Sequence, residues 1–280
     1  MIHRRRASTC AVSADLRRRI ARLCPDWDAA AISGFVFQEG GYSNANYRFE
    51  YAGERYVLRA ATATRGFVDR EQERRIYASG SPALPEMVAF DTGSGDMICR
   101  WVPGALLADL APDAATLADY LAKLHHNLPH LERIYDPVAQ ARAHLEAAAA
   151  PAWLETLAAR TRWAPPRLEP CHNDLNPWNV IRTPEQRWVT LDWEWAGHND
   201  PVFDLVNLHQ GTRLADTALP EMAARYAGED VAEARLEACI TALWLRETTW
   251  ALAEVAGGND RPEIREQAET GMERLRARGS

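Results

Sequence analysis

The order of secondary-structure patterns constrains this chain more than any other feature of its sequence. Alternating apolar and polar residues, which are typical of half-buried strands, lie in about the first hundred residues. The clearest case is "ANYRFEY", which is followed by Ala52-Gly53 and then by "ERYVLRA", so we expect an antiparallel hairpin with a short turn. Helical spacing of apolar residues dominates the remainder. Strands and helices that occupy separate parts of a chain predict an α+β fold.

The expected elements follow this division. In the first part we expect five strands, at "ISGFVFQEGG", "ANYRFEY", "ERYVLRA", "EMVAF" and "DMICRW", and helices over residues 13–23 and 68–79. The stretch "VPGALLADLAPD" is interpreted as a linker, which predicts an N-terminal lobe of residues 1–101 and a C-terminal lobe of residues 102–280. After the linker we expect helices over residues 113–127, 136–161, 216–227, 230–256 and 262–277.

Composition excludes several classes of partner. The apolar fraction of 47% and the charged fraction of 25% are typical of a soluble globular protein. A net charge of −7 leaves no basic footprint for nucleic acid, and no apolar run is long enough to span a membrane. The five cysteines are widely spaced and form no C-x-x-C, which fits a reducing cytoplasm better than a disulfide framework or a zinc site. We therefore expect a cytoplasmic protein without a nucleic-acid, membrane or protein partner.

The stretch "CHNDLNPWNV", residues 171–180, carries the strongest chemical signal. Its flanks hold the only strand patterns of the second half, "NVIR" and "RWVTLDW". Phosphoryl transfer from ATP needs a carboxylate at the acceptor hydroxyl, oxygen ligands for Mg²⁺ and a cation on the phosphates. A kinase catalytic loop places an Asn five residues after its Asp, as Asn179 follows Asp174 here. A second metal carboxylate, Asp192, ends the following strand.

These motifs resemble a known family. The segments "CHNDLNPWNV…LDWEWAGHNDPVFDL" and "EGGYSNANYRFEYAGERYVLR" are similar to the signature regions of the aminoglycoside phosphotransferase and choline kinase superfamily, in its choline/ethanolamine kinase-like branch. The resemblance implies a two-lobed protein-kinase-like fold and an ATP-dependent kinase of a small alcohol that uses Mg²⁺. It also implies one role for each matching residue: Asp174 as base, Asn179 and Asp192 as metal ligands, Arg59 on the phosphates, Glu73 as its helix partner and Asp204 as a structural carboxylate.

The residues support the nucleotide site independently. The only lysine, Lys123, lies in a helical pattern, so the strand-borne cation that contacts the phosphates has to be Arg59. An arginine can take this role, because its guanidinium donates two parallel hydrogen bonds to phosphate oxygens. Ser43 and Asn44 follow a Gly-Gly pair and can offer donors to phosphate, although the same residues also suit an ordinary hairpin turn. Trp101, at the end of the first lobe, is a further candidate contact of the nucleotide.

The acceptor is a small molecule on this interpretation. Only twelve positions separate Asp192 from Asp204, which leaves no platform for a peptide substrate. Trp244, Glu247 and Trp250 recur at three-residue intervals in a helical pattern, and aromatic faces with one carboxylate suit an ammonium group. Trp195, which flanks the metal motif, is added as a fourth candidate for substrate binding. The alternative is that the tryptophans are core residues and that Glu247 pairs with an arginine.

Several roles stay open at this point. The acceptor is expected to be a cationic, choline- or ethanolamine-like alcohol, with thiamine or an aminoglycoside as alternatives and a catalytically inactive nucleotide-binding relative as the non-enzyme alternative. Glu194 is either an additional acid near the metal or a solvated surface residue. His172 is expected to brace the loop backbone, His125 to pack against the loop, and Asp200 to form a turn before Pro201.

Overall fold

The computed structural model describes residues 9–38, 44–62, 68–259 and 261–278. The chain forms two compact units. One consists of Met1–Leu110 with Trp178–Trp195, and the other of Ala111–Pro177 with Ala196–Ser280. Each unit is described in turn.

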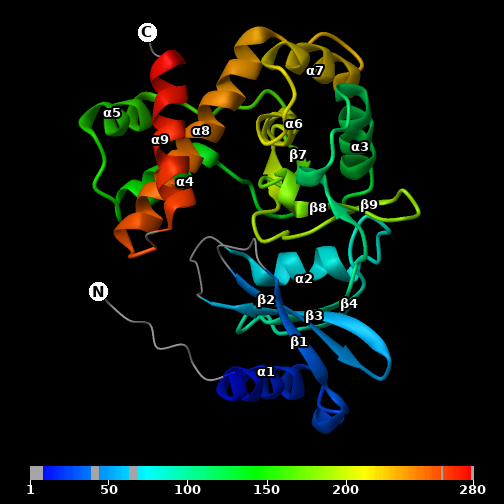
Figure 1. Ribbon diagram of the computed structural model, residues 1–280. Helices are drawn as coiled ribbons and strands as arrows, with labels where there is room; N and C mark the ends of the chain where they lie inside the picture. Colours follow the sequence, from blue (N-terminus) through cyan, green and yellow to red (C-terminus); the bar gives the residue numbers. More distant parts are fainter. Residues whose placement is uncertain (1–8, 39–43, 63–67, 260, 279–280) are drawn as a thin grey trace. The chain divides into compact units, whose positions relative to one another are not determined.

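An antiparallel sheet of five strands forms the centre of the first unit (Figure 1). Its strands, in spatial order, are β1 (Ser33–Gln38), β2 (Asn44–Tyr51), β3 (Glu54–Ala61), β5 (Met97–Arg100) and β4 (Met87–Phe90). The predicted hairpin is confirmed as β2 and β3, which pair from Tyr51↔Glu54 to Asn44↔Ala61. Both turn residues, Ala52 and Gly53, have positive φ, as a tight two-residue hairpin turn requires.

The alternation along β3 gives the two faces of this sheet different tasks. Leu58 is fully buried in a cluster with Leu16 and Ile20 of α1 (Thr9–Leu23). Its neighbour Arg59 projects to the opposite face, because successive side chains in a strand alternate. There it meets Glu73 of α2 (Arg70–Ala78). One strand thus supplies both a core residue and a charged residue for a site.

A second, three-stranded sheet also belongs to the first unit. It contains β6 (Ala105–Leu106), β8 (Val180–Arg182) and β9 (Trp188–Thr190) in the order β6-β8-β9. Because β6 pairs with β8, residues 102–110 and 178–195 group with the N-terminal sheet, whereas the predicted lobes were the contiguous stretches 1–101 and 102–280. Gly104 permits this pairing, since a Cβ there would lie 2.4 Å from the carbonyl oxygen of Arg182.

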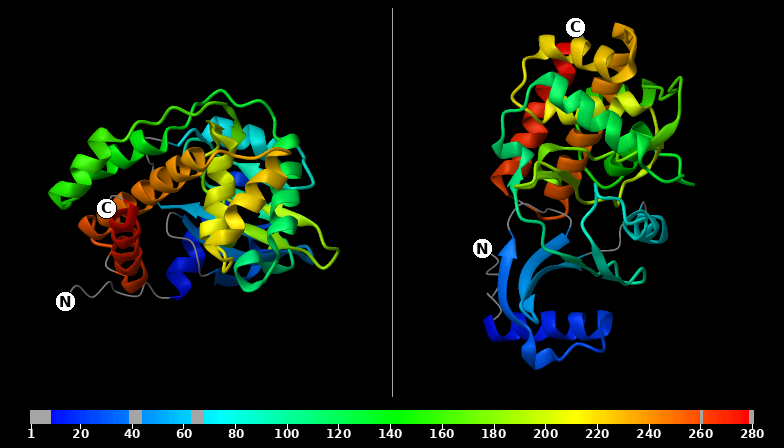
Figure 2. Two further views of the ribbon diagram at one scale, coloured as in Figure 1. Left: turned by 90° about the horizontal axis from the view of Figure 1, so that it is seen from above. Right: turned by 90° about the vertical axis from the view of Figure 1, so that its right-hand side faces the viewer.

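The second unit is mainly helical. Its helices are α3 (Ala114–His126), α4 (Pro137–Leu145), α5 (Ala152–Arg160), α6 (Pro201–Gln210), α7 (Leu219–Ala227), α8 (Glu233–Ala256) and α9 (Pro262–Arg278), and its strands β7 (Glu169–Cys171) and β10 (Gly197–Asn199) form an antiparallel pair. Helices α8 and α9 lie side by side, and α4 packs on α8 (Figure 2). Short 3₁₀ turns span Ala29–Ala31, Leu107–Asp109, Pro177–Asn179 and Asp216–Ala218.

Two expectations about the second unit need correction. The single helix predicted over residues 136–161 is wrong, because α4 ends at Leu145 and α5 begins at Ala152. Pro151 precedes α5 in an extended conformation, and a proline interrupts a helix since it lacks the backbone N–H. Strands β7 and β10 were not predicted, because three-residue strands carry too little alternation to be recognised. None of the described helices is both long and apolar enough to cross a membrane.

Candidate active site

The loop that follows β7 has an unusual backbone conformation at Asn173. Its φ is 68°, in the left-handed region that non-glycine residues seldom adopt. The Asn173 side chain stabilises this conformation, because its Nδ2 donates to the Gly197 carbonyl at 3.1 Å and its Oδ1 accepts from Asn199 Nδ2 at 2.9 Å. Both partners lie on β10. The β7–β10 pair therefore fixes the turn from which Asp174 projects.

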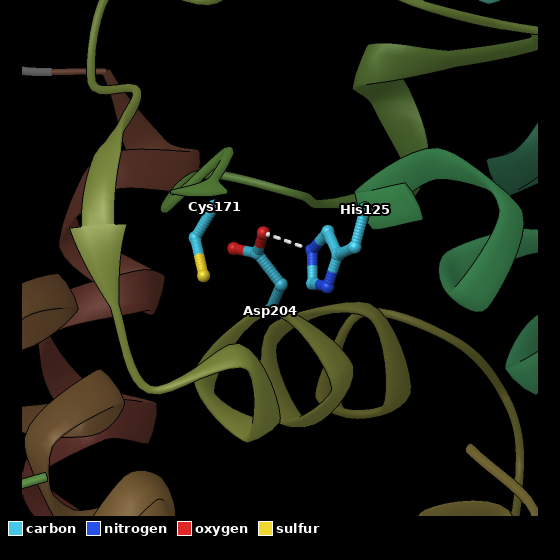
Figure 3. A group of neighbouring side chains, drawn as sticks. All are labelled: His125, Cys171 and Asp204. Atoms are coloured by element: carbon cyan, nitrogen blue, oxygen red, sulfur yellow. Dashed lines mark hydrogen bonds and ion pairs between the residues drawn. The ribbon is translucent and has the colours of Figure 1, made fainter. Parts of the chain in front are cut away.

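Asp204 of α6 holds the same loop by its backbone. Its buried carboxylate accepts the N–H of His172 at 2.6 Å and the N–H of Asn173 at 2.7 Å. His125 of α3 lies 3.0 Å from the same carboxylate through Nε2 (Figure 3). Burial by itself would raise the pKa of Asp204, but the hydrogen bond and charge of His125, with the neighbouring His172, outweigh it and lower that pKa. Asp204 is thus a charged anchor for the loop.

The expectations for the histidines and for Asp200 can now be compared with the contacts. His172 Nδ1 accepts the N–H of Asp174 at 3.1 Å, so His172 braces the loop as predicted. His125 contacts the loop anchor Asp204, which confirms its packing role. Asp200 begins α6 as its N-cap and accepts the N–H of Val202 at 2.9 Å, a more specific role than the predicted turn.

His125, Cys171 and Asp204 place potential ligand atoms within 4.8 Å of one another, which is the one such group of three among the described residues (Figure 3). Two observations argue against a metal there. Both carboxylate oxygens of Asp204 already accept backbone N–H groups. The thiol of Cys171 also has a partner already, since its Sγ donates to the carbonyl oxygen of Asn199 at 3.6 Å. We assign the group to loop anchoring.

Asp174, the predicted base, combines a fixed backbone with an accessible carboxylate. Its side chain is 26% exposed. On its inner side, Oδ1 lies 3.2 Å from a terminal nitrogen of Arg246 in α8. Arg246 was not singled out from the sequence, since it lies 72 residues from Asp174 and no local pattern joins them.

The first unit carries the charged pair predicted for the nucleotide. Arg59 is buried and donates to both carboxylate oxygens of Glu73, and it also donates to the Gly95 carbonyl at 3.2 Å. Burial by itself would lower the pKa of Arg59, but the Glu73 carboxylate outweighs it and raises that pKa. Arg59 therefore keeps its charge, and its two hydrogen bonds to Glu73 fix the direction of the guanidinium, as a phosphate-binding cation requires.

Asn179 and Asp192 come from the same end of the β8–β9 hairpin. Asn179 precedes β8 and Asp192 follows β9, and the Leu191 N–H donates to the Asn179 carbonyl at 2.8 Å. The Asp192 side chain is 34% exposed, and its Oδ1 lies 3.9 Å from Arg59. A carboxylate and an amide oxygen in this arrangement form a donor set that suits Mg²⁺.

Sequence reasoning missed Arg70. This residue of α2 donates to Glu73 at 2.7 Å and to Glu194 at 3.2 Å. Glu194 is buried and also accepts from Asn44 Nδ2 at 3.4 Å, so the solvated alternative for Glu194 is wrong. The three-residue spacing of Arg70 and Glu73 on one helix was the available signal, because residues at i and i+3 are neighbours.

The remaining nucleotide candidates lie apart from this network or outside the described residues. Trp101 is half-buried beside the guanidinium of Arg48, 5.6 Å from the ring centroid, and its N–H donates to the Arg55 carbonyl at 2.9 Å. It lies toward the turn end of the β2–β3 hairpin, about 13 Å along the strand from Arg59 at 3.3 Å per residue. Ser43 lies outside the described residues.

The tryptophans of α8 that were predicted to bind the acceptor contact other residues of the second unit. Trp244 donates to Gln210 at 3.1 Å, and Arg274 lies over its ring at 5.8 Å. Trp250 packs against a small apolar cluster formed by Ala251 of α8 and by Ile264 and Ala268 of α9.

Glu247 has partners on two helices. One of its carboxylate oxygens accepts from Arg246 Nε at 2.9 Å, and the other accepts from Gln267 of α9. The alternative reading, in which Glu247 pairs with an arginine, is therefore what the structure contains. Trp195, the fourth candidate, belongs to the first unit and is buried.

Comparisons with known proteins agree with this chemistry. The model of a family described as "Phosphotransferase enzyme family" matches residues 36–239. Protein LicA of Haemophilus influenzae is 27% identical over 202 residues, which are 64% of this chain and 58% of that protein. The chain thus matches less than two thirds of the length of this curated relative.

Two solved structures share the fold over nearly their whole length. One is a choline/ethanolamine kinase family protein from Mesorhizobium loti, with a TM-score of 0.71, 22% identity and coverage of 95% of this chain and 94% of that one. The other is choline kinase LicA from Streptococcus pneumoniae, with a TM-score of 0.74, 16% identity and coverage of 95% and 99%. These matches confirm the predicted α+β, kinase-like fold class.

Proposed function

Because the chain belongs to the phosphotransferase enzyme family, we propose that it is an ATP-dependent kinase that phosphorylates the hydroxyl group of a small cationic alcohol. The signature motifs around Asp174 and Asp192 predict the same family. Relatives described as choline or choline/ethanolamine kinases support the acceptor class.

The observation that carries the proposal is the state of Asp174. Phosphoryl transfer asks a protein mainly to position groups and to stabilise charge. Asp174 follows a backbone that Asp204 and the β7–β10 pair hold in place, yet a quarter of its side chain remains exposed. A carboxylate that is both immobilised and accessible can orient an acceptor hydroxyl and accept its proton.

In this proposal, residues of the first unit neutralise the negative charge of the nucleotide phosphates. Asn179 and Asp192 would hold Mg²⁺, which supplies charge neutralisation at the phosphates when bound. Arg59, oriented by Glu73, would contribute a fixed positive charge beside Asp192. Ser43, Asn44 and Trp101 complete the proposed nucleotide contacts.

The acceptor contacts are proposed for Trp195, Trp244 and Trp250. The face of Trp244 already lies under a guanidinium, that of Arg274, which supports an aromatic surface that accepts cations. Arg246 and Gln267 already occupy the carboxylate of Glu247, so Glu247 is not counted among the acceptor contacts and its role is argued below.

A panel of acceptors tests the function directly. Purified protein with Mg·ATP is offered choline, ethanolamine, thiamine, an aminoglycoside and 3,3-dimethylbutanol, the uncharged isostere of choline. Formation of ADP and of phosphorylated product is measured for each. The proposal predicts turnover with an amino alcohol and little with the isostere. Turnover confined to thiamine or the aminoglycoside would reassign the acceptor, and no turnover with any alcohol would favour an inactive nucleotide-binding relative.

A further inference from the structure

Arg246 is a buried cation that no part of the proposed function uses. It lies near the middle of α8 and is 4% exposed. Burying a guanidinium is costly unless its donors are paired. Every partner of Arg246 described below lies in the second unit, so their geometry does not depend on how the two units are placed.

The guanidinium binds the catalytic loop at two points. One terminal nitrogen donates to the carbonyl of Asn173 and to the hydroxyl of Tyr135, the latter at 3.1 Å. The other terminal nitrogen donates to Asp174 Oδ1 at 3.2 Å. Asp204 accepts the N–H of Asn173, and Arg246 donates to the carbonyl oxygen of the same residue, so the two peptide units that flank the Asn173 Cα are both restrained.

Glu247 orients this guanidinium. Its Oε1 accepts from Nε of Arg246 at 2.9 Å and from the same terminal nitrogen that reaches Asp174. Its Oε2 is held by Gln267 of α9. The two helices approach closely beside this link, since a Cβ on Gly271 would lie 2.0 Å from Thr248 Oγ1. One nitrogen of Arg246 therefore joins two carboxylates, one of which is the proposed base.

We propose that Arg246 is a positioning residue for Asp174, and that Glu247 influences the base through Arg246. The inference rests on the proposed function for the role of Asp174, but the contacts themselves do not. The planar fork of an arginine fixes direction as well as charge, whereas a lysine at this position would supply only a point charge. Replacement of Arg246 by lysine should leave every residue of the loop in place in the sequence but remove the directed hydrogen bonds, so that Asp174 can move.

Two variants separate positioning from acceptor binding. In Arg246→Lys we expect kcat for the amino alcohol to fall about 100-fold, the loss typical of a misplaced catalytic group. The KM values for the acceptor and for ATP should stay within about threefold of the wild-type values, because the substitution removes no contact with either substrate. In Glu247→Gln, kcat should fall about tenfold with the acceptor KM unchanged. An increase in acceptor KM at constant kcat would instead place Glu247 at the substrate and overturn its link to the base.

A matched control lies on the same helix. Arg235 of α8 forms a two-point contact with Asp200, at 2.6 and 2.9 Å, whereas Arg246 contacts Asn173 and Asp174. Arg235→Lys should change the melting temperature as Arg246→Lys does, but it should leave kcat near that of the wild type. Equal kcat values for the two lysine variants would overturn the proposal.

A readout without any acceptor separates this inference from the proposed function. Amide hydrogen exchange of residues 172–174 should be faster in Arg246→Lys than in the wild type and in Arg235→Lys, because the Asn173 carbonyl loses its restraint. Should the wild type phosphorylate no alcohol, the proposed function fails while this measurement still decides whether Arg246 holds the loop. Exchange at wild-type rates in Arg246→Lys would overturn the inference. Should Arg246→Lys fail to fold, Glu247→Gln provides both the kinetic and the exchange test.

Discussion

The phenolic oxygen of Tyr77 accepts a hydrogen bond from the backbone N–H of Asp192 at 3.1 Å. Asp192 has a φ of 59°, in the left-handed region, so its backbone needs this support. Burial raises the pKa of Tyr77 well above its usual range, which keeps the phenol neutral. Tyr77 lies one helical turn after Glu73, the partner of Arg59. Helix α2 thus orients both Asp192, the proposed metal carboxylate, and Arg59, the proposed phosphate cation.

Replacement of Tyr77 by Phe should weaken the binding of Mg·ATP about tenfold. The change removes the hydrogen bond that the part-buried N–H of Asp192 donates to the phenolic oxygen, a loss of about 1–3 kcal/mol. Titration calorimetry of Mg·ATP into the variant and the wild type measures the difference. The same titration with ATP in EDTA is the control and should show a much smaller change. Equal Mg·ATP affinities would mean that Tyr77 does not support the metal carboxylate.

Asp192→Asn should remove most of the dependence of nucleotide binding on Mg²⁺. A hard divalent cation prefers charged carboxylate oxygens, and an amide offers one neutral oxygen. The ratio of ATP affinities with and without Mg²⁺ should therefore fall toward one in the variant. A ratio equal to that of the wild type would place the metal on other residues.

Asp204→Asn should destabilise the protein by about 2–3 kcal/mol at pH 7, since an amide nitrogen would then face one of the two backbone donors. The folded-state pKa of Asp204 is lowered below its ordinary value of 3.8. Its contribution is therefore fully present above about pH 4 and is lost as the pH falls through the folded-state pKa.

Urea unfolding at pH 7 and at pH 3 checks this prediction. The difference between the wild type and Asp204→Asn should shrink at the lower pH. Asp119→Asn serves as a control, because the Asp119–Arg225 pair is half exposed and should matter far less. A difference that stays constant with pH would contradict a charged Asp204.

Trp244→Leu should raise the KM for a cationic acceptor several-fold and leave the KM for ATP unchanged. A cation over an aromatic ring is stabilised by about 0.5–2 kcal/mol, depending on how far it is desolvated, and leucine offers no such face. Steady-state kinetics with the amino alcohol and with its uncharged isostere measure the effect. If both acceptors lose affinity equally, Trp244 contributes packing and not recognition of charge.

The sequence predicted the parts of the fold that have a strong local pattern. The clearest case is the hairpin of β2 and β3, whose strands have 8 residues each. The charged pair Arg59–Glu73 was implied by the family resemblance, and the structure contains it. The prediction of one helix over residues 136–161 was wrong. The stretch before Pro151 is rich in alanine, which is typical of a helix, but the proline lacks the N–H that a continuous helix would need there.

Contacts between distant segments could not be predicted in this way. Arg246 meets Asp174 across 72 residues, and Arg70 meets Glu194 across 124. Which arginine pairs with which carboxylate depends on tertiary packing, and local patterns contain no information about it. For Glu247 the sequence indicated only that an inward carboxylate needs a partner, and it left the arginine and the substrate as alternatives.

The most direct test of the account is transfer of the γ-phosphate of ATP to an amino alcohol by the wild type and by Asp174→Asn. The wild type should form phosphorylated product in the presence of Mg²⁺. The variant should lose at least about 1,000-fold in kcat, because an amide cannot accept the hydroxyl proton. It should still bind Mg·ATP and unfold at nearly the wild-type temperature. Product formation by Asp174→Asn within about tenfold of the wild-type rate would contradict the assignment of Asp174 as the base.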